Sequence, residues 1–272
     1  MRLSQGQLNL LERCPRQFQH TYLDGIISPT SLEQQERLSS GSRFHLLMQQ
    51  RELGLPIDAL VKEDEQLQGW MNAFAIAATE ILTPSADGEF RESEHCRTLQ
   101  VQEYLLTVIY DLFIAKTDTC QILDWKTYPK PQDRRKLAQN WQTLLYQYVL
   151  AETSTYLPAQ ISMTYWFVQS DEKPQSLTFT YSNTQHQQIE KKLNSLLLQL
   201  TNWLKRYEQG EQFSQVVEGS KTCNYCQFIS RCVGRSTGQS HRDRNFEPDL
   251  SEQEHSTNKL LNLANIQEVT IG

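Results

Sequence analysis

Two short apolar runs near the middle of the chain constrain its fold most. Residues 108–115 and 120–126 are rich in β-branched and aromatic side chains, and the triplet Thr117-Asp118-Thr119 separates them. Runs of this length and composition predict β-strands, and the polar triplet predicts a tight turn. We therefore expect an antiparallel strand pair at this point of the chain.

The rest of the pattern predicts helices and strands around this pair. Ser4 is a plausible N-cap of a short helix that ends near Pro15. Residues 16–30 read as a connector. Further helices are expected over residues 33–53, 63–83, 133–152 and 184–209, and further strands over residues 90–96, 99–107, 159–168 and 176–181. This order predicts an α/β protein with a mixed central sheet flanked by helices.

Two aspartates and a lysine lie in the strand pair. Residues two apart in a strand point to the same face, so Asp124 and Lys126 project together. If the strands pair antiparallel, Asp111 reaches the same place. Two carboxylates together bind hard cations such as Mg²⁺ or Mn²⁺, and a nearby lysine can orient an attacking water, which suits phosphodiester hydrolysis. The alternative is a solvated ion pair of no catalytic importance.

Three cysteines near the C-terminal end have the spacing of a metal site. Cys223, Cys226 and Cys232 fall within ten residues, and disulfides are rare in cytosolic proteins. Zinc and iron–sulfur centres both require a fourth ligand, for which Cys14 is the natural candidate. Cys96 and Cys120 lie in expected strands and are expected to be buried as small apolar residues.

The acidic motif resembles a known nuclease pattern. Asp111, followed by Ile-Leu-Asp124-Trp125-Lys126-Thr, resembles the RecB-like branch of the PD-(D/E)XK superfamily, whose usual form is GxxD followed by a hydrophobic-Asp-Tyr-Lys-Thr strand. The chain departs from that form at Val108, where the glycine is usual. Glu94 stands where relatives often carry a strand glutamate, and we interpret it as a supporting residue and not as a ligand.

Two further segments resemble the same branch, in the same order along the chain. The string Gly-Ser-Arg-Phe-His45 resembles the helix that supplies a histidine metal ligand, and Gln142 with Tyr146 resembles the QxxxY signature. The resemblance implies a restriction-endonuclease-like core. It also implies that the cation is held by His45, Asp111, Asp124 and the backbone carbonyl of Trp125, that Lys126 serves the water, and that Gln142 and Tyr146 position the substrate.

The N-terminal segment carries a second part of the resemblance. Ser4-x-x-x-Leu8 followed by Cys14-Pro-x-x-Phe18 resembles RecB-like nucleases with iron–sulfur clusters, including the AddB nuclease domain and CRISPR-associated exonucleases. This implies a [4Fe–4S] cluster that joins the two ends of the chain through Cys14, Cys223, Cys226 and Cys232. A structural Zn²⁺ ion is the alternative.

Charge and composition limit the possible partners. The net charge is −6, whereas nucleic-acid binders are often basic, so DNA binding requires local positive charge. Candidate contacts to the DNA backbone are Lys130, Arg134, Arg135 and Lys136. The absence of a GxxxxGK[ST] loop argues against a helicase or ATPase. No apolar run is long enough for a membrane span and the start does not resemble a signal peptide, so we expect a cytoplasmic protein.

These observations predict one nuclease domain over residues 1–235, a polar linker over 236–258 and a short apolar tail over 259–272. The expected activity is exonucleolytic or end-processing cleavage of single-stranded or frayed DNA. DNA repair or recombination and CRISPR spacer acquisition both suit it, with a protein partner from either pathway. One alternative is a catalytically silent nucleic-acid-binding or assembly subunit that retains the fold. Another is a zinc-stabilised interaction protein.

Overall fold

The computed structural model divides the chain into two compact units. The first comprises residues 1–3 and 31–191, and the second comprises residues 4–30 and 192–272. The expected linker (236–258) and tail (259–272) lie outside the described residues, which are 1–27, 31–62, 64–83, 89–128, 133–169, 173–217 and 219–232.

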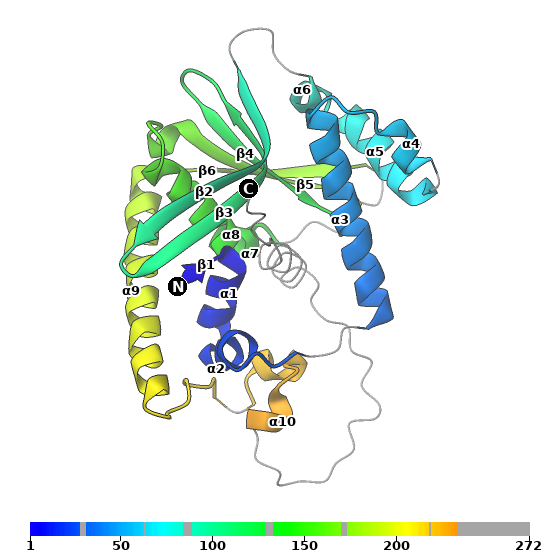
Figure 1. Cartoon of the computed structure of the whole chain (residues 1–272). Coiled ribbons are helices and arrows are strands. Elements are labelled where there is room, and N and C mark those ends of the chain that lie inside the picture. Colours follow the sequence, from blue (N-terminus) through cyan, green and yellow to red (C-terminus); the bar gives the residue numbers. More distant parts are fainter. Residues whose placement is uncertain are drawn as a thin grey trace, which may run out of the picture. The chain divides into compact units, whose positions relative to one another are not determined.

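The first unit is built on a mixed β-sheet (Figure 1). Its strands within the described residues are β1 (Arg2–Leu3), β2 (Phe90–Val101), β3 (Tyr104–Ala115), β4 (Cys120–Lys126), β5 (Ile161–Phe167) and β6 (Gln175–Thr180). The strand order is β1-β3-β4-β5-β6, and β2 pairs with the other side of β3. The β3–β4 and β5–β6 pairs are antiparallel, whereas β4 and β5 are parallel. The predicted pairing of the two central runs is therefore confirmed.

The strand boundaries predicted between residues 90 and 115 were wrong. The three runs expected over residues 90–115 are in fact two long strands, β2 and β3, which pair from Phe90↔Ala115 to Val101↔Tyr104. The connection is a two-residue turn in which Gln102 has a positive φ of 54°. The turn contains no glycine, proline or asparagine, so the usual turn signal was missing from the sequence.

Two helices cover one face of the sheet. Helix α3 (Leu32–Glu52) starts at Ser31, whose side chain accepts from the backbone N–H of Gln34, and α5 (Glu65–Ala77) starts at Asp64, which caps it in the same way. The two short helices beside them are α4 (Asp58–Val61) and α6 (Thr79–Leu82). The core beneath these helices includes Phe44, Leu47, Met48, Met71, Phe74, Leu112, Leu123, Trp125 and Trp166. This apolar burial fixes α3 and α5 over β3, β4 and β5.

The helix expected over residues 133–152 is broken in two. Helix α7 (Arg134–Gln139) ends at Asn140, and α8 (Trp141–Glu152) begins there because the Asn140 side chain accepts from the backbone N–H of Gln142. Helix α8 packs against β2, β3 and β5. Leu123 and Trp125 of β4 belong to the core beneath α3 and α5, whereas Gln142 of α8 contacts the alternate residues of β4. The helices α8 and α3 therefore lie on opposite faces of β4.

The second unit is mainly helical. Its elements are α1 (Gln5–Arg13), α2 (Pro15–Phe18), the π-helix η1 (Gln19–Leu23), the 3₁₀ helix η3 (Lys221–Tyr225) and α10 (Ile229–Cys232), together with the C-terminal part of α9 (Asn183–Glu208), which begins in the first unit. Ser4 caps α1 as predicted, and its backbone N–H donates to the Gln7 side chain at 2.8 Å. The connector expected over residues 16–30 is instead helical as far as Leu23. Among the described helices, none is long and apolar enough to cross a membrane.

Candidate active site

Asp111 and Asp124 face each other across β3 and β4. The last regular pair of these strands is Leu112↔Leu123, so the two aspartates occupy the next position of the register. Both side chains are buried. The backbone N–H of Trp125 donates to Asp111 Oδ2 at 2.7 Å, which holds the Asp111 carboxylate in a fixed orientation.

Asp124, Lys126 and Gln142 form a closed buried network. Lys126 Nζ lies 2.6 Å from Asp124 Oδ1 and donates to Gln142 Oε1 at 2.9 Å, while Gln142 Nε2 donates to Asp124 Oδ2 at 2.6 Å. Burial raises the pKa of Asp124 to about 6, against the opposing effect of Lys126 and with the added effect of the Asp111 charge. The carboxylate is thus held as an anion mainly by its lysine partner.

Aromatic rings surround this network. Lys126 Nζ lies 5.4 Å from the centre of the Tyr165 ring, a distance at which the ring attracts the ammonium group. Tyr146 lies one turn after Gln142 on α8, and burial together with the charges of Asp124 and Asp111 raises its pKa well above the usual range. The QxxxY pair therefore shares the face of α8 that packs on the acidic strand.

His45 reaches the same place from α3. Its Nδ1 atom lies 3.3 Å from Asp111 Oδ1. Gly41, one helical turn earlier, makes this approach possible, because a Cβ atom there would lie 2.9 Å from Thr127 Oγ1 just after β4. The glycine in the string that ends at His45 thus allows α3 to lie close to the end of β4.

Glu94 joins His45 and Asp111. One potential ligand atom from each of these three residues lies within 4.8 Å of the others. Glu94 lies in β2 with a φ of 52°, a left-handed backbone that non-glycine residues seldom adopt. The sequence singled out Glu94 only by resemblance and as a supporting residue, whereas the structure brings its carboxylate close to His45 and Asp111. Asp124, the carboxylate of the sequence motif, contacts Lys126 and Gln142.

The donors of this group suit a hard divalent cation. Mg²⁺ and Mn²⁺ prefer octahedral coordination with bonds of about 2.0–2.1 Å, so neighbouring ligands lie about 3 Å apart and opposite ones about 4.2 Å apart. The 3.3 Å separation of His45 and Asp111 falls in this range, and the limit of 4.8 Å for the group exceeds it only slightly. Carboxylates are ligands that suit both Mn²⁺ and Mg²⁺, whereas imidazole is a ligand for Mn²⁺ more than for Mg²⁺.

Comparison with known proteins decides the family. The chain matches the PD-(D/E)XK nuclease superfamily over residues 2–233.

The chain belongs to the PD-(D/E)XK nuclease superfamily.

Membership in this superfamily agrees with the mixed sheet, the flanking helices and the buried Asp–Asp–Lys set, and it indicates a metal-dependent nuclease. No curated protein matches the chain. Among solved structures, the crystal structure of SSO0001 is similar with a TM-score of 0.38 and 10% sequence identity, and the match covers 86% of this chain and 85% of that chain.

The basic residues expected at the DNA backbone lie on α7. Arg134, Arg135 and Lys136 are all exposed, and Lys130 lies outside the described residues. Arg134 donates to the backbone carbonyl of Thr178 and lies 4.8 Å from the centre of the Phe179 ring. Arg134 is thus anchored to β6, where it stabilises the edge of the sheet.

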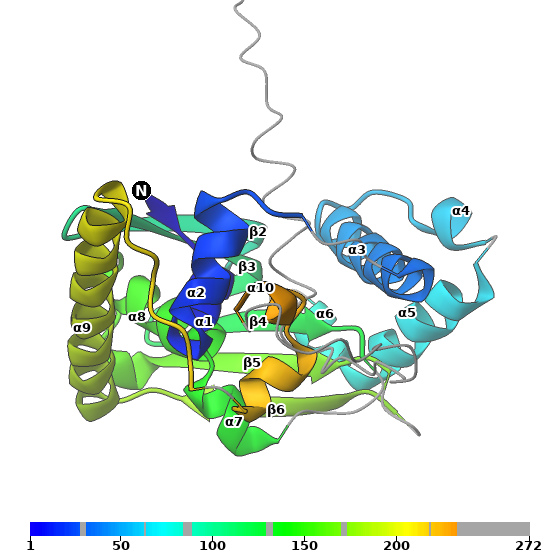
Figure 2. The ribbon, with the colours of Figure 1, turned by 90° about the horizontal axis from the view of Figure 1, so that it is seen from below.

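The four cysteines of the expected cluster all belong to the second unit. Cys14 is buried between α1 and α2, and the other three are partly buried around η3 and α10. Burial raises the pKa of the Cys226 thiol, and Cys14, Cys232 and Cys223 lie close enough to raise it further. Figures 1 and 2 show α10 beside α1 and α2. Among the described residues, however, no three of these sulfur atoms lie within 4.8 Å of one another.

The other two cysteines differ from each other. Cys120 is buried as expected, but Cys96 is exposed, so the expectation for Cys96 was wrong. Within the described residues, β2 pairs only with β3 and lies at an edge of the sheet. Burial alternates along much of β2, and Cys96 falls on the exposed side of the strand.

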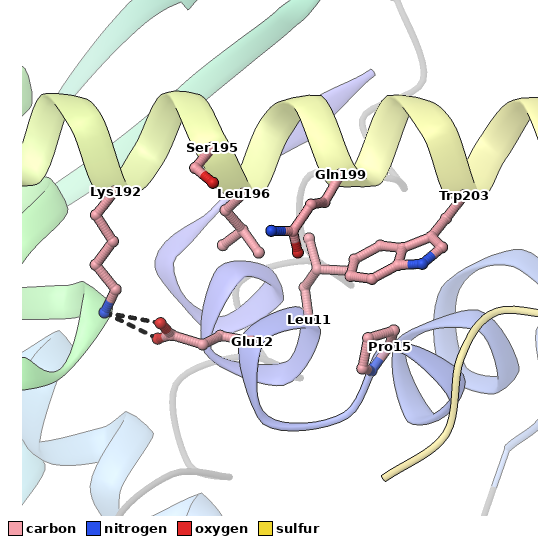
Figure 3. A pocket seen from close by; sticks show the side chains of 8 residues that line it. All are labelled: Leu11, Glu12, Pro15, Lys192, Ser195, Leu196, Gln199 and Trp203. Atoms are coloured by element: carbon pink, nitrogen blue, oxygen red, sulfur yellow. Dashed lines mark hydrogen bonds and ion pairs between the residues drawn. The ribbon is translucent and has the colours of Figure 1, made fainter.

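The second unit also contains a cavity of about 400 Å³ between α1 and α9 (Figure 3). Leu11, Leu196 and Trp203 form its apolar wall, and an ion pair between Glu12 and Lys192 at 2.9 Å closes one end. None of its lining residues belongs to the acidic site or to the cysteine set.

Proposed function

We propose that this chain is a Mg²⁺- or Mn²⁺-dependent deoxyribonuclease that acts as an exonuclease or end-processing nuclease on single-stranded or frayed DNA. The observation that carries the proposal is the buried Asp111–Asp124 pair with Lys126 beside it and His45 at 3.3 Å from Asp111. A purely structural role would not require two carboxylates to be buried opposite each other, because burying like charges costs free energy.

The residues divide the chemistry between them. His45, Asp111, Asp124 and the carbonyl of Trp125 would hold the cation, which supplies water activation and charge neutralisation at the phosphate. Lys126 orients the attacking water, and Gln142 keeps Lys126 and Asp124 in a fixed geometry. Tyr146 lies on the same face of α8 as Gln142 and helps to position the substrate. Water attacks phosphorus, the bond to one ester oxygen breaks, and that oxygen leaves with a proton.

The substrate would lie along exposed basic residues. Arg135 and Lys136 on α7 provide positive charge that binds phosphates without reading sequence. Lys130 and Arg134 remain candidates for the same role. A biological setting in DNA repair, recombination or CRISPR spacer acquisition, with a protein partner from one of these pathways, suits a nuclease that degrades free ends.

The direct test uses oligonucleotides labelled at the 5′ or 3′ end, with Mg²⁺, Mn²⁺ or a chelator. We expect cation-dependent cleavage of single strands, and the order of the labelled products gives the polarity. An Asp111→Asn variant should bind the DNA and not cleave it. Binding without cleavage by the wild-type protein under all conditions would instead favour a catalytically silent DNA-binding or assembly subunit.

We also propose that Cys14, Cys223, Cys226 and Cys232 bind a [4Fe–4S] cluster within a nuclease domain that spans residues 1–235. Their mutual influence on thiol pKa values supports this. Arg16 also supports it, because burial raises the pKa of Cys232 and the Arg16 guanidinium lowers it, as suits a site that carries thiolates. Such a cluster would convert metal-binding free energy into folding free energy. Iron, sulfide and zinc per chain distinguish the cluster from structural zinc.

A further inference from the structure

We propose that Glu94 is a direct ligand of the divalent cation, together with His45 and Asp111. This inference rests on the proposed function, since it concerns the same metal site. It assigns a role to a residue of β2, a strand that carries none of the other expected catalytic residues.

Strand register places Glu94 directly opposite Asp111. The flanking pairs are Ser93↔Leu112 and His95↔Tyr110, so position 94 of β2 faces position 111 of β3. Directly opposite residues of antiparallel strands have Cβ atoms about 4.5–5.5 Å apart, and like charges there destabilise the pair. A cation bound between the two carboxylates turns this repulsion into attraction.

The backbone at Glu94 supports a functional role. Its φ of 52° is left-handed, although the residue lies inside a strand and is not glycine. The regular pairing of β2 with β3 is interrupted at this residue alone and resumes on both sides in the same register. A strained backbone conformation persists only where the surrounding structure enforces it, and such residues cluster at functional sites.

Glu94 also belongs to the electrostatic environment of the acidic site. The pKa of Tyr146 is raised by burial first and then by the charges of Asp124, Asp111 and Glu94. Whereas Asp111 is buried, Glu94 is only partly buried. Glu94 is therefore the more solvent-accessible of the two opposite carboxylates.

The distances agree with shared coordination. The three donor atoms lie within 4.8 Å of one another, close to the span of about 3–4.2 Å expected for ligands of one octahedral cation. Asp124 is engaged by Lys126 and Gln142. Glu94 thus adds a carboxylate within reach of the atoms of His45 and Asp111 that would hold the cation.

The rival explanation is a positioning role, in which Glu94 orients His45 without touching the cation. The two roles are distinguished by the affinity for Mn²⁺ of protein freed of divalent cations. This affinity is measured by calorimetry and by the electron paramagnetic resonance of unbound Mn²⁺. The variants are Glu94→Gln, which keeps the size and hydrogen bonding of the side chain, and Glu94→Gly, which removes it. Thermal unfolding is measured on the same metal-free samples.

Gln102→Gly is the matched control. Gln102 is the other non-glycine residue with positive φ in the described residues, it lies in the turn that joins β2 and β3, and it is outside the acidic site. Glycine tolerates this backbone, so both glycine variants should melt at or above the wild-type temperature. We expect Gln102→Gly to bind Mn²⁺ within twofold of wild type, and both Glu94 variants to bind at least about tenfold more weakly.

The proposal is overturned if either Glu94 variant binds Mn²⁺ within about threefold of wild type. Loss of affinity in Glu94→Gly with full affinity in Glu94→Gln would also overturn it and favour the positioning role. An Asp111→Asn variant shows whether a negative result concerns Glu94 alone or the proposed metal site as a whole. If Asp111→Asn loses Mn²⁺ and the Glu94 variants retain it, the metal site stands and only the role of Glu94 is wrong.

Discussion

The ion pair between Asp124 and Lys126 offers the sharpest test of the proposed catalytic residues. Replacement of Asp124 by alanine should abolish cleavage, because the site loses a carboxylate. It should also destabilise the fold, because the Lys126 side chain is only 3% exposed and its Nζ atom lies 2.6 Å from the carboxylate. The variant leaves a buried ammonium group without its counter-charge.

The size of the effect follows from the burial of both partners. Removing one member of a buried ion pair costs about 3–5 kcal/mol, out of a total unfolding free energy of about 5–15 kcal/mol. For a domain of this size, each kcal/mol lowers the melting temperature by about 2–4 °C. Asp124→Ala should therefore melt about 6–20 °C below the wild-type protein.

A double-mutant cycle isolates the pair. Lys126→Met removes the charge and keeps the length of the side chain, so Asp124→Ala/Lys126→Met contains no buried charge at either position. We expect the double variant to be at least about 2 kcal/mol more stable than Asp124→Ala, and to be equally inactive. The measurements are urea unfolding in the presence of a chelator, and cleavage of a labelled single strand.

Two results would refute this reasoning. An unfolding free energy of Asp124→Ala within about 1 kcal/mol of wild type would show that Lys126 is solvated. A double variant as unstable as Asp124→Ala would show that packing at position 124, and not the unpaired charge, causes the loss. Cleavage above about a tenth of the wild-type rate in either variant would remove Asp124 from the mechanism.

Three further predictions concern other parts of the protein. Lys126→Ala should retain Mn²⁺ binding by calorimetry while turnover falls by about two to four orders of magnitude; a collapse of metal affinity would contradict the separate role of the lysine. Gly41→Ala should lower activity at least about tenfold with little change in stability, because the new Cβ would lie 2.9 Å from Thr127 Oγ1, and adding Thr127→Ala should restore the activity. Cys14→Ser should lose iron and brown colour and should melt lower, whereas the exposed Cys96→Ser should keep its iron; unchanged iron in Cys14→Ser would place the fourth ligand elsewhere.

Local patterns predicted much of the first unit. The helix cap at Ser4, the period of two that puts Asp124 and Lys126 on one face, and the turn between β3 and β4 depend on a few neighbouring residues. Where the signal was weak, local reasoning failed. The turn at Gln102 carries no turn residue, and the break at Asn140 depends on a single cap.

The four cysteines could be grouped from their spacing and residue type, because few other roles suit three cysteines within ten residues. The relative positions of their sulfur atoms could not be predicted, because Cys14 and Cys232 are separated by nearly the whole described chain. The exposure of Cys96 likewise depended on which strand forms the edge of the sheet. Edge and centre are properties of the assembled sheet and not of one strand.

The sequence by itself therefore determined which residue types would carry the proposed chemistry: two aspartates, a lysine and a histidine at recognisable spacings. Only the tertiary structure decided which of them meet. The register of β2 on β3 placed Glu94 opposite Asp111, and the close approach of α3 at Gly41 brought His45 to within 3.3 Å of Asp111. Strand register and helix approach are set by apolar burial over the whole sheet, and such long-range packing leaves no periodic signal at the residues it brings together.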